Sequence, residues 1–491
     1  MFTLINLLNI TIMRKKWIPC VVENYDTILK MRRPNGSSAS WYLKEEGELN
    51  IPGNFADMHF MDRNKVMSTT YERTYFDEIT TDDYKDVLPE AKLEQVKYAI
   101  NKLSTCIKYI TISDLDKEEY KDTHYFYIIS MWNGDFWERH KDIGFECIHN
   151  KVKEDIKNQQ CTLIFEYTAE PHSWNALDMF KKLEEWRLQS KFPANSLYFL
   201  SGNLLAEDIV KENKYGYKAK GFSTFEAPLK PASQIPKYNP TDKANLFLNY
   251  NRRPRVHRLL FLHNVIKDGI MDRGLCSYGS ETFNDADYFV KNGRILYKSA
   301  TNPHGRYDRI CEVDQEVCDN LDNYELRIGN QSLVDNLALT PYVYEDYSST
   351  FLSVVNETNV DNNILFLSEK IWKPILLEHP FLVIGNPFTL QKLREMGYKT
   401  FGDYWDESYD EITSFPDRIK AVNNILIDLS KKSVSELKAL RVEMEDILAY
   451  NRATFNVTLN QYFYGRDDIL PVGDFLEELY KERSNARKTI V

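Results

Sequence analysis

Cysteine is scarce in this chain of 491 residues, and the few that occur follow no functional pattern. No two of them form a CxxC pair, and none of their spacings is typical of zinc ligands. The sequence therefore predicts free thiols in a reducing compartment, without a disulfide framework or a zinc site. The seven cysteines are Cys20, Cys106, Cys147, Cys161, Cys276, Cys311 and Cys318.

Glycine-rich phosphate loops and an excess of positive charge are also missing. The chain has neither GxGxxG nor a GKS or GKT loop, so NAD-dependent enzymes and P-loop NTPases lose their main support. The formal net charge is −11, which opposes a protein that coats nucleic acid without sequence preference. A local basic groove is still compatible with this composition.

No hydrophobic run in the sequence is long enough for a membrane span. The apolar residues 1–13 are fewer than the roughly 20 that a spanning helix needs. Basic residues 14–16 follow this run, whereas in a secretory signal they precede it. We therefore expect a cytoplasmic protein, in the host cytoplasm if the chain is viral, whose start is either Met1 or Met13.

Apolar stretches of strand length alternate with amphipathic stretches of helix length, which predicts an α/β fold with mostly parallel sheets. The length favours two domains. Four prolines mark residues 227–242 as a linker, between an N-terminal Rossmann-like domain at 14–226 and a second domain at 243–450. Residues 451–491 are expected to be a tail, and the polar stretch 284–339 to be loops.

Residues 366–385, FLSEKIWKPILLEHPFLVIG, carry the most information about function. Ser368 suits a helix N-cap, where free backbone N–H groups favour anions. Glu369, Lys370 and Lys373 have the spacing of one helix face, so two ammonium groups would add to that field. Such charges are also common on solvated helices, but Pro374 would cost a surface helix about 3 kcal/mol. The proline therefore favours a site that is shaped for a ligand.

This segment resembles the donor-binding segment of GT-B glycosyltransferases, especially fucosyltransferase-like enzymes and relatives from large viruses and phages. The resemblance runs from Phe366 to Asp410 and extends more weakly back to Ala244. It implies two Rossmann-like domains facing across a cleft, with Glu369 on the donor ribose and Lys370 on its diphosphate. Residues 372–374, Trp-Lys-Pro, depart from the fucosyltransferase pattern and leave the identity of the sugar open.

A second cationic segment, residues 251–258, follows a predicted strand and enters a predicted helix. Its arginines would suit phosphate oxygens in a doubly wound domain. The alternative is a solvated basic turn. By analogy with the viral relatives, Arg253 and Arg258 are the stronger candidates for donor binding, and His257 is expected to be a packing or hydrogen-bonding residue.

An inverting transfer needs a base within reach of the acceptor hydroxyl. The candidates at predicted strand ends are Glu170, which we place first, and then Asp135 and Glu166. Two DxD patterns, at 114–116 and 285–287, match the metal-binding motif of GT-A enzymes, but 73 acidic residues make such matches expected by chance. We expect a metal-independent site without a cofactor.

The resulting hypothesis is an inverting glycosyltransferase that moves a sugar from a nucleotide-diphosphate donor, with UDP or GDP open, to a hydroxyl of a glycan. Two alternatives remain at this point. The acceptor could be a hydroxymethylated base in viral DNA, which would have to be extruded from the duplex. The chain could also be a non-catalytic carbohydrate-binding or structural protein that has the fold but transfers nothing.

Overall fold

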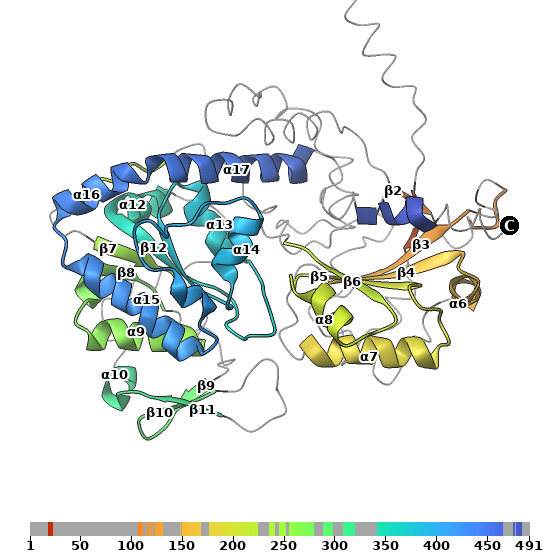
Figure 1. The fold of residues 1–491 in the computed structure, drawn as a ribbon, viewed down its shortest axis with the longest axis horizontal. Helices are drawn as coiled ribbons and strands as arrows, with labels where there is room; N and C mark the ends of the chain where they lie inside the picture. The colour runs from red at the N-terminus through yellow and green to blue at the C-terminus, as the bar shows by residue number, and fades with distance from the viewer. Residues whose placement is uncertain are drawn as a thin grey trace, which may run out of the picture.

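The computed structural model consists of two halves, each built on a parallel sheet (Figure 1). Its description covers the residues 18–22, 107–110, 115–118, 120, 123–130, 148, 150–167, 176–223, 235–240, 245–251, 255–278, 288–297, 308–319, 341–464, 475–476 and 478–483. Within these ranges, no helix has the length and apolarity of a membrane span.

The N-terminal half holds a six-stranded sheet in the order β2-β1-β3-β4-β5-β6, in which every pairing is parallel. The apolar runs predicted as strands form β1 to β5, and the amphipathic stretch after β4 forms α7. Its elements are β1 (Ile18–Val22), β2 (Ile107–Ile110), β3 (Tyr125–Ser130), α6 (Asn150–Lys157), β4 (Cys161–Tyr167), α7 (Ala176–Gln189), β5 (Leu197–Ser201), α8 (Ala206–Glu212) and β6 (Lys218–Gly221).

The C-terminal half holds a parallel sheet in the order β13-β12-β7-β8, covered by helices. Its buried residues form one large apolar cluster around β7, β12, β13, α9 and α13. The elements are β7 (Asn245–Asn249), α9 (Val256–Lys267), β8 (Gly274–Cys276), α12 (Pro341–Ser349), β12 (Thr350–Asn356), α13 (Glu369–Leu376), β13 (Phe381–Ile384), α14 (Thr389–Glu395), α15 (Phe415–Ser430), α16 (Val434–Glu443) and α17 (Glu445–Tyr464).

The two parallel sheets confirm the predicted α/β class, and their arrangement is consistent with two Rossmann-like domains. One expectation was wrong. Part of the stretch predicted as loops is an antiparallel sheet, β11-β10-β9, followed by the short helix α10 (Gln315–Asp319). Its strands are β9 (Tyr288–Val290), β10 (Arg294–Tyr297) and β11 (Asp308–Glu312). These strands, of three to five residues, are too short to show a clear period in the sequence.

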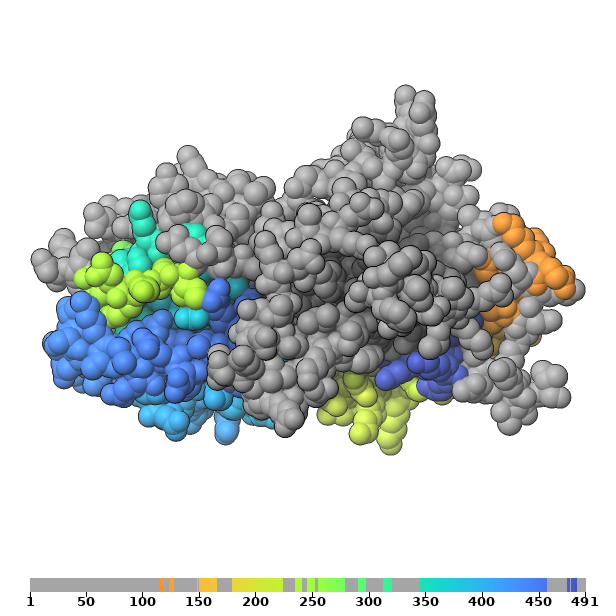
Figure 2. All heavy atoms as spheres, turned by 90° about the horizontal axis from the view of Figure 1, so that it is seen from above, coloured from red at the N-terminus to blue at the C-terminus, as the bar shows by residue number. Residues whose placement is uncertain are grey.

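The chain returns to the N-terminal half near its C-terminus. Helix α17 packs on α13, and the residues 475–483 then contact strands of the first sheet. Tyr480 meets Phe126 of β3 edge to face, and Arg483 donates to the hydroxyl of Tyr198 on β5. Figure 2 shows these dark-blue residues against yellow-green residues of the N-terminal half. Residues 475–476 and 478–483, which belong to the expected tail, therefore pack against the N-terminal half.

Candidate functional site

The C-terminal sheet changes its winding direction between β7 and β12. The first two strands along the chain, β7 and β8, are neighbours, whereas β12 pairs on the other side of β7. In open α/β sheets, ligands bind outside the carboxyl ends of the strands at such a switch point. The residues that follow β7 and β12 are therefore the first place to search for a site.

Three buried asparagines join the ends of these two strands. Asn356 donates its side-chain amide to the Oδ1 atom of Asn251 at 3.0 Å, and Asn249 donates to the carbonyl of Val354 at 2.7 Å. Asn251 in turn donates to Oδ1 of Asn249 at 2.5 Å. These contacts keep the switch point polar and hold the two strand ends together.

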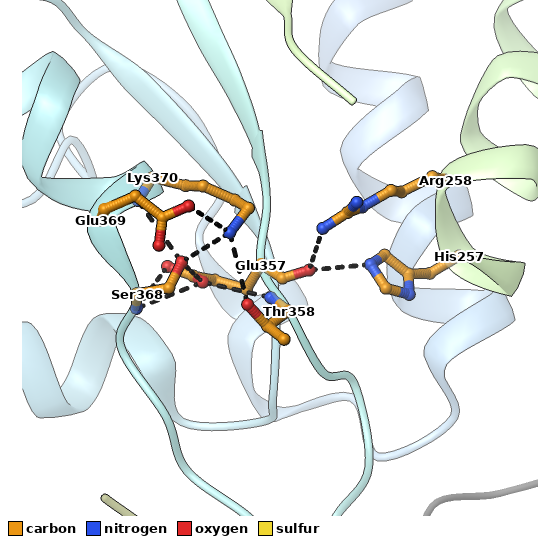
Figure 3. Close-up of polar contacts among 7 residues, drawn as sticks. All are labelled: His257, Arg258, Glu357, Thr358, Ser368, Glu369 and Lys370. Atoms are coloured by element: carbon orange, nitrogen blue, oxygen red, sulfur yellow. Dashed lines mark hydrogen bonds and ion pairs between the residues drawn. The ribbon is translucent and has the colours of Figure 1, made fainter. Parts of the chain in front are cut away.

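Helix α13 begins beside this switch point and is capped as the sequence predicts. Ser368 has an extended backbone, and its hydroxyl accepts from the N–H of Lys370 at 3.4 Å. The hydroxyl also donates to the carboxylate of Glu357 at 2.5 Å, and the backbone N–H of Ser368 donates to the same carboxylate at 3.3 Å. The protein's own carboxylate therefore uses part of the hydrogen-bonding capacity of the helix start (Figure 3).

Lys370 holds its ammonium in the middle of this group. The Nζ atom lies 2.7 Å from Glu369 Oε1, 3.1 Å from Ser368 Oγ and 3.3 Å from Thr358 Oγ1. Burial by itself would raise the pKa of Glu369, but the charge and hydrogen bond of Lys370 and the charge of Lys373 together outweigh it and lower this pKa. The Glu369 carboxylate is therefore ionised at neutral pH.

Lys373 lies one turn further along α13 and differs from Lys370. The residue is only 9% exposed, and within the described part of the chain its ammonium has no hydrogen-bond or ion-pair partner. Burial lowers its pKa to about 8, although the charge of Glu369 acts in the opposite direction. A largely buried lysine whose pKa is lowered in this way suits an anionic ligand, which would favour its charged form.

The rest of α13 is buried, so the alternative of a solvated surface helix was wrong. Residues 371–376 are all buried, and Trp372 is fully covered. The Trp372 ring stacks on Phe455 of α17, with ring centroids 5.7 Å apart, and lies 5.4 Å from the ring of Tyr398. The structure also places Pro374 inside the helix, as the sequence predicts.

Helix α9 brings a third cation to the end of β12. Arg258 is buried and donates to the backbone carbonyl of Glu357 at 3.3 Å, while His257 Nε2 lies 2.9 Å from the same oxygen. Burial lowers the pKa of His257 well below its usual value, so the ring is neutral and donates to this carbonyl. His257 thus has the hydrogen-bonding role that the sequence suggested. Figure 3 shows Arg258 and Lys370 reaching Glu357 and Thr358 from opposite sides.

The structure thus brings Arg258, Ser368, Glu369 and Lys370 to the carboxyl end of β12. Lys373 lies one turn further along α13. It also adds Glu357, which the sequence reasoning missed. The carboxyl group of Glu357 is fully buried, and burial raises its pKa against the opposing charge of Lys370. A lone glutamate after a strand matches no motif, and its position directly after an apolar run was the only available signal.

The other predicted site residues are described in part or not at all. Glu166 belongs to β4, where its backbone pairs with Ser130 and Leu200 near the carboxyl edge of the N-terminal sheet. Arg253, Asp135 and Glu170 lie outside the described residues. Among the described residues, no group of histidine, cysteine, aspartate and glutamate side chains is arranged to hold a metal ion.

Comparison with known proteins gives little further information. No protein-family model matches the chain, and no curated protein matches it. A search of solved structures found the DNA-modifying enzyme β-glucosyltransferase, described with and without its substrate uridine diphosphoglucose. That chain is 11% identical, the match covers 94% of this chain and 99% of that one, and the TM-score is 0.29. A likeness at this score does not bear on the function of this protein.

Proposed function

We propose that the protein is a GT-B glycosyltransferase whose nucleotide-diphosphate sugar binds at the start of α13. The observation that carries this proposal is Lys373, a residue that is only 9% exposed, whose pKa burial lowers to about 8 and whose ammonium has no hydrogen-bond or ion-pair partner among the described residues. Lys370 and Arg258 contact residues at the carboxyl end of β12, and Lys373 lies one turn further along the same helix as Lys370. Cations and helix N–H groups in such a place favour a diphosphate.

Each group at the site then has a distinct role. Lys370, Lys373, Arg258 and Arg253 neutralise the diphosphate and stabilise the charge that develops as it leaves. Glu369 would be repelled by phosphate and therefore accepts from a ribose hydroxyl. Ser368 and Glu357 hold the start of the helix in place. With lysine and arginine as counter-charges, the transfer needs no metal ion.

The acceptor, a glycan in this proposal, binds on the N-terminal half, which supplies the base from Glu170, Asp135 or Glu166. This assignment is supported by the contact between the halves. Leu204, in the turn after the carboxyl end of β5, donates its N–H to the carbonyl of Leu365 at 2.8 Å, in the segment that leads to α13. The loops that follow the carboxyl ends of β5 and β12 therefore contact each other, which supports an acceptor site on the N-terminal half close to the donor site.

The test is a thermal-shift panel of UDP, GDP and their sugar conjugates on the wild type and two variants. A ligand that binds the folded protein alone raises its melting temperature. Lys370→Ala should weaken nucleotide binding by about tenfold or more, because a charged hydrogen bond contributes about 1.5–3 kcal/mol. The melting temperature without ligand should also fall, because the change leaves the mostly buried Glu369 carboxylate without its counter-charge, so binding is read from the shift that the ligand causes in each variant.

Lys392→Ala is the matched control, because it removes the same charge from α14, where Lys392 pairs with Glu395 at 3.0 Å. It should leave nucleotide binding unchanged. Unaltered affinity in Lys370→Ala would show that the donor site lies elsewhere. Failure of the wild type to bind any nucleotide would favour a non-catalytic protein. Steeply salt-dependent binding to duplex DNA would point to DNA rather than a glycan as the acceptor.

A further inference from the structure

The turn between β5 and α8 of the N-terminal half reaches into the C-terminal half. Its residue Asn203 is fully buried and contacts the segment 363–365, about 160 positions away. The side-chain amide donates to the carbonyl of Asn363 at 3.2 Å, and Oδ1 accepts from the N–H of Leu365 at 3.0 Å. One asparagine thus satisfies a donor and an acceptor of the opposite half.

The turn itself is shaped for this contact. Oδ1 of Asn203 also accepts from the N–H of Leu205 at 3.1 Å, and the N–H of Asn203 donates to Ser201 Oγ at 2.9 Å. Leu204 packs against the apolar core of the C-terminal half. A Cβ atom at Gly221 would lie 2.5 Å from the carbonyl oxygen of Asn203, so only glycine permits this close approach.

The segment that Asn203 contacts leads directly to the candidate donor site. Leu365 lies three residues before Ser368, and residues 364–368 are all buried. The C-terminal half fixes the same segment at two more points. Asn386 accepts from the N–H of Phe366 at 3.2 Å, and Glu357 accepts from that of Ser368. Asn203 and the backbone N–H of Leu204, which donates to the carbonyl of Leu365, are the contribution of the N-terminal half to this set of contacts.

We propose that Asn203 is a positioning residue for the donor site, through which the N-terminal half holds the Ser368 helix start in its binding geometry. The inference rests on the proposed function insofar as the ligand is a nucleotide diphosphate. Removing the side chain breaks both of its hydrogen bonds to the segment 363–365 and leaves the Leu204 N–H as the remaining hydrogen bond to this segment, so the helix start is held less firmly in its binding geometry.

Two measurements on Asn203→Ala separate this role from the identity of the ligand. The first is amide hydrogen exchange of residues 365–370 without ligand, which should become faster than in the wild type. The second is the affinity for UDP and GDP, which should fall by about tenfold if the helix start then holds its binding geometry only about a tenth of the time. Amides of β13, which Asn203 does not contact, should exchange as before.

Asn213→Ala is the control, because Asn213 lies after α8 in the same half and donates to the carbonyl of Ile209 at 2.8 Å. It should alter neither the exchange of 365–370 nor nucleotide affinity. If Asn203→Ala does not fold, Asn203→Ser removes the amide from this buried turn without adding a charge, and it should show the same changes.

Unchanged exchange of residues 365–370 in a folded Asn203 variant would overturn the positioning role, and so would faster exchange with full nucleotide affinity. A wild type that binds no nucleotide would instead refute the proposed function. In that case the exchange data would still decide whether Asn203 holds the start of α13.

Discussion

At the scale of single residues, the two lysines of α13 differ in their burial and in their partners. Lys370 is already paired with Glu369, whereas Lys373 is buried without a direct partner among the described residues. Moving a lysine pKa from 10.5 to about 8 corresponds to about 3 kcal/mol of unfavourable charge burial. A ligand that places a negative charge beside Lys373 would offset this free energy on binding.

The lowered pKa of Lys373 predicts opposite effects of pH on stability and on binding. Between pH 8 and about 10.5, the unfolded chain holds a proton that the folded protein has released, so the free energy of unfolding of the empty protein rises with pH. Nucleotide affinity should instead fall as the pH rises through about 8, because the cation is lost. Calorimetric titration and thermal melts from pH 7 to 9.5 measure both effects.

Lys373→Met removes the titrating group at similar length, and Lys373→Arg keeps the charge throughout this range. Affinity in the methionine variant should be low, and any remaining pH dependence is then due to other groups. The arginine variant should bind without the fall near pH 8. A wild-type affinity that is flat across pH 8 would exclude Lys373 from the ligand contacts.

At the scale of elements, the apolar periodicity and the capping residues of the sequence predicted strands and a helix start. The apolar runs became parallel strands, and the predicted cap became the start of α13 at Ser368. Contacts that depend on tertiary structure could not be predicted. Glu357 acquires its partners only when β12 meets α13, and Asn203 finds Leu365 across the two halves. Neither contact leaves a local pattern in the sequence.

Helix α13 is held by its buried face, and Trp372 is the main anchor. Its ring is fully buried between Tyr398 and Phe455. Trp372→Ala should therefore lower the free energy of unfolding by about 3–5 kcal/mol. Trp372→Phe keeps an aromatic ring and should cost less. Urea unfolding measures both, with the exposed Val442→Ala as the control. A loss below about 1 kcal/mol in the alanine variant would mean that α13 is anchored by other residues.

At the scale of the whole molecule, the two halves are joined both near the candidate site and by the end of the chain. Asn203 and Leu204 form the first connection, and residues 475–483 form the second. Leu476 and Leu479 are buried there, and Phe475 lies against Tyr198 and Phe222. The N-terminal sheet therefore depends for part of its packing on residues that follow the C-terminal half in the sequence.

This dependence predicts that the double variant Phe475→Ala, Tyr480→Ala destabilises the N-terminal half and leaves the C-terminal half unchanged. Each ring makes two contacts with aromatic rings of the N-terminal half, and an aromatic pair contributes about 0.5–1.5 kcal/mol beyond its buried area. The N-terminal half should lose about 2 kcal/mol or more. Amides of β3 and β5 should then exchange faster, whereas those of β12 and β13 keep their protection. The control is Leu188→Ala, which shortens an exposed side chain on α7. Equal loss of protection in both sheets would mean that the halves unfold as one unit, because a local defect in the first sheet would then open the second as well.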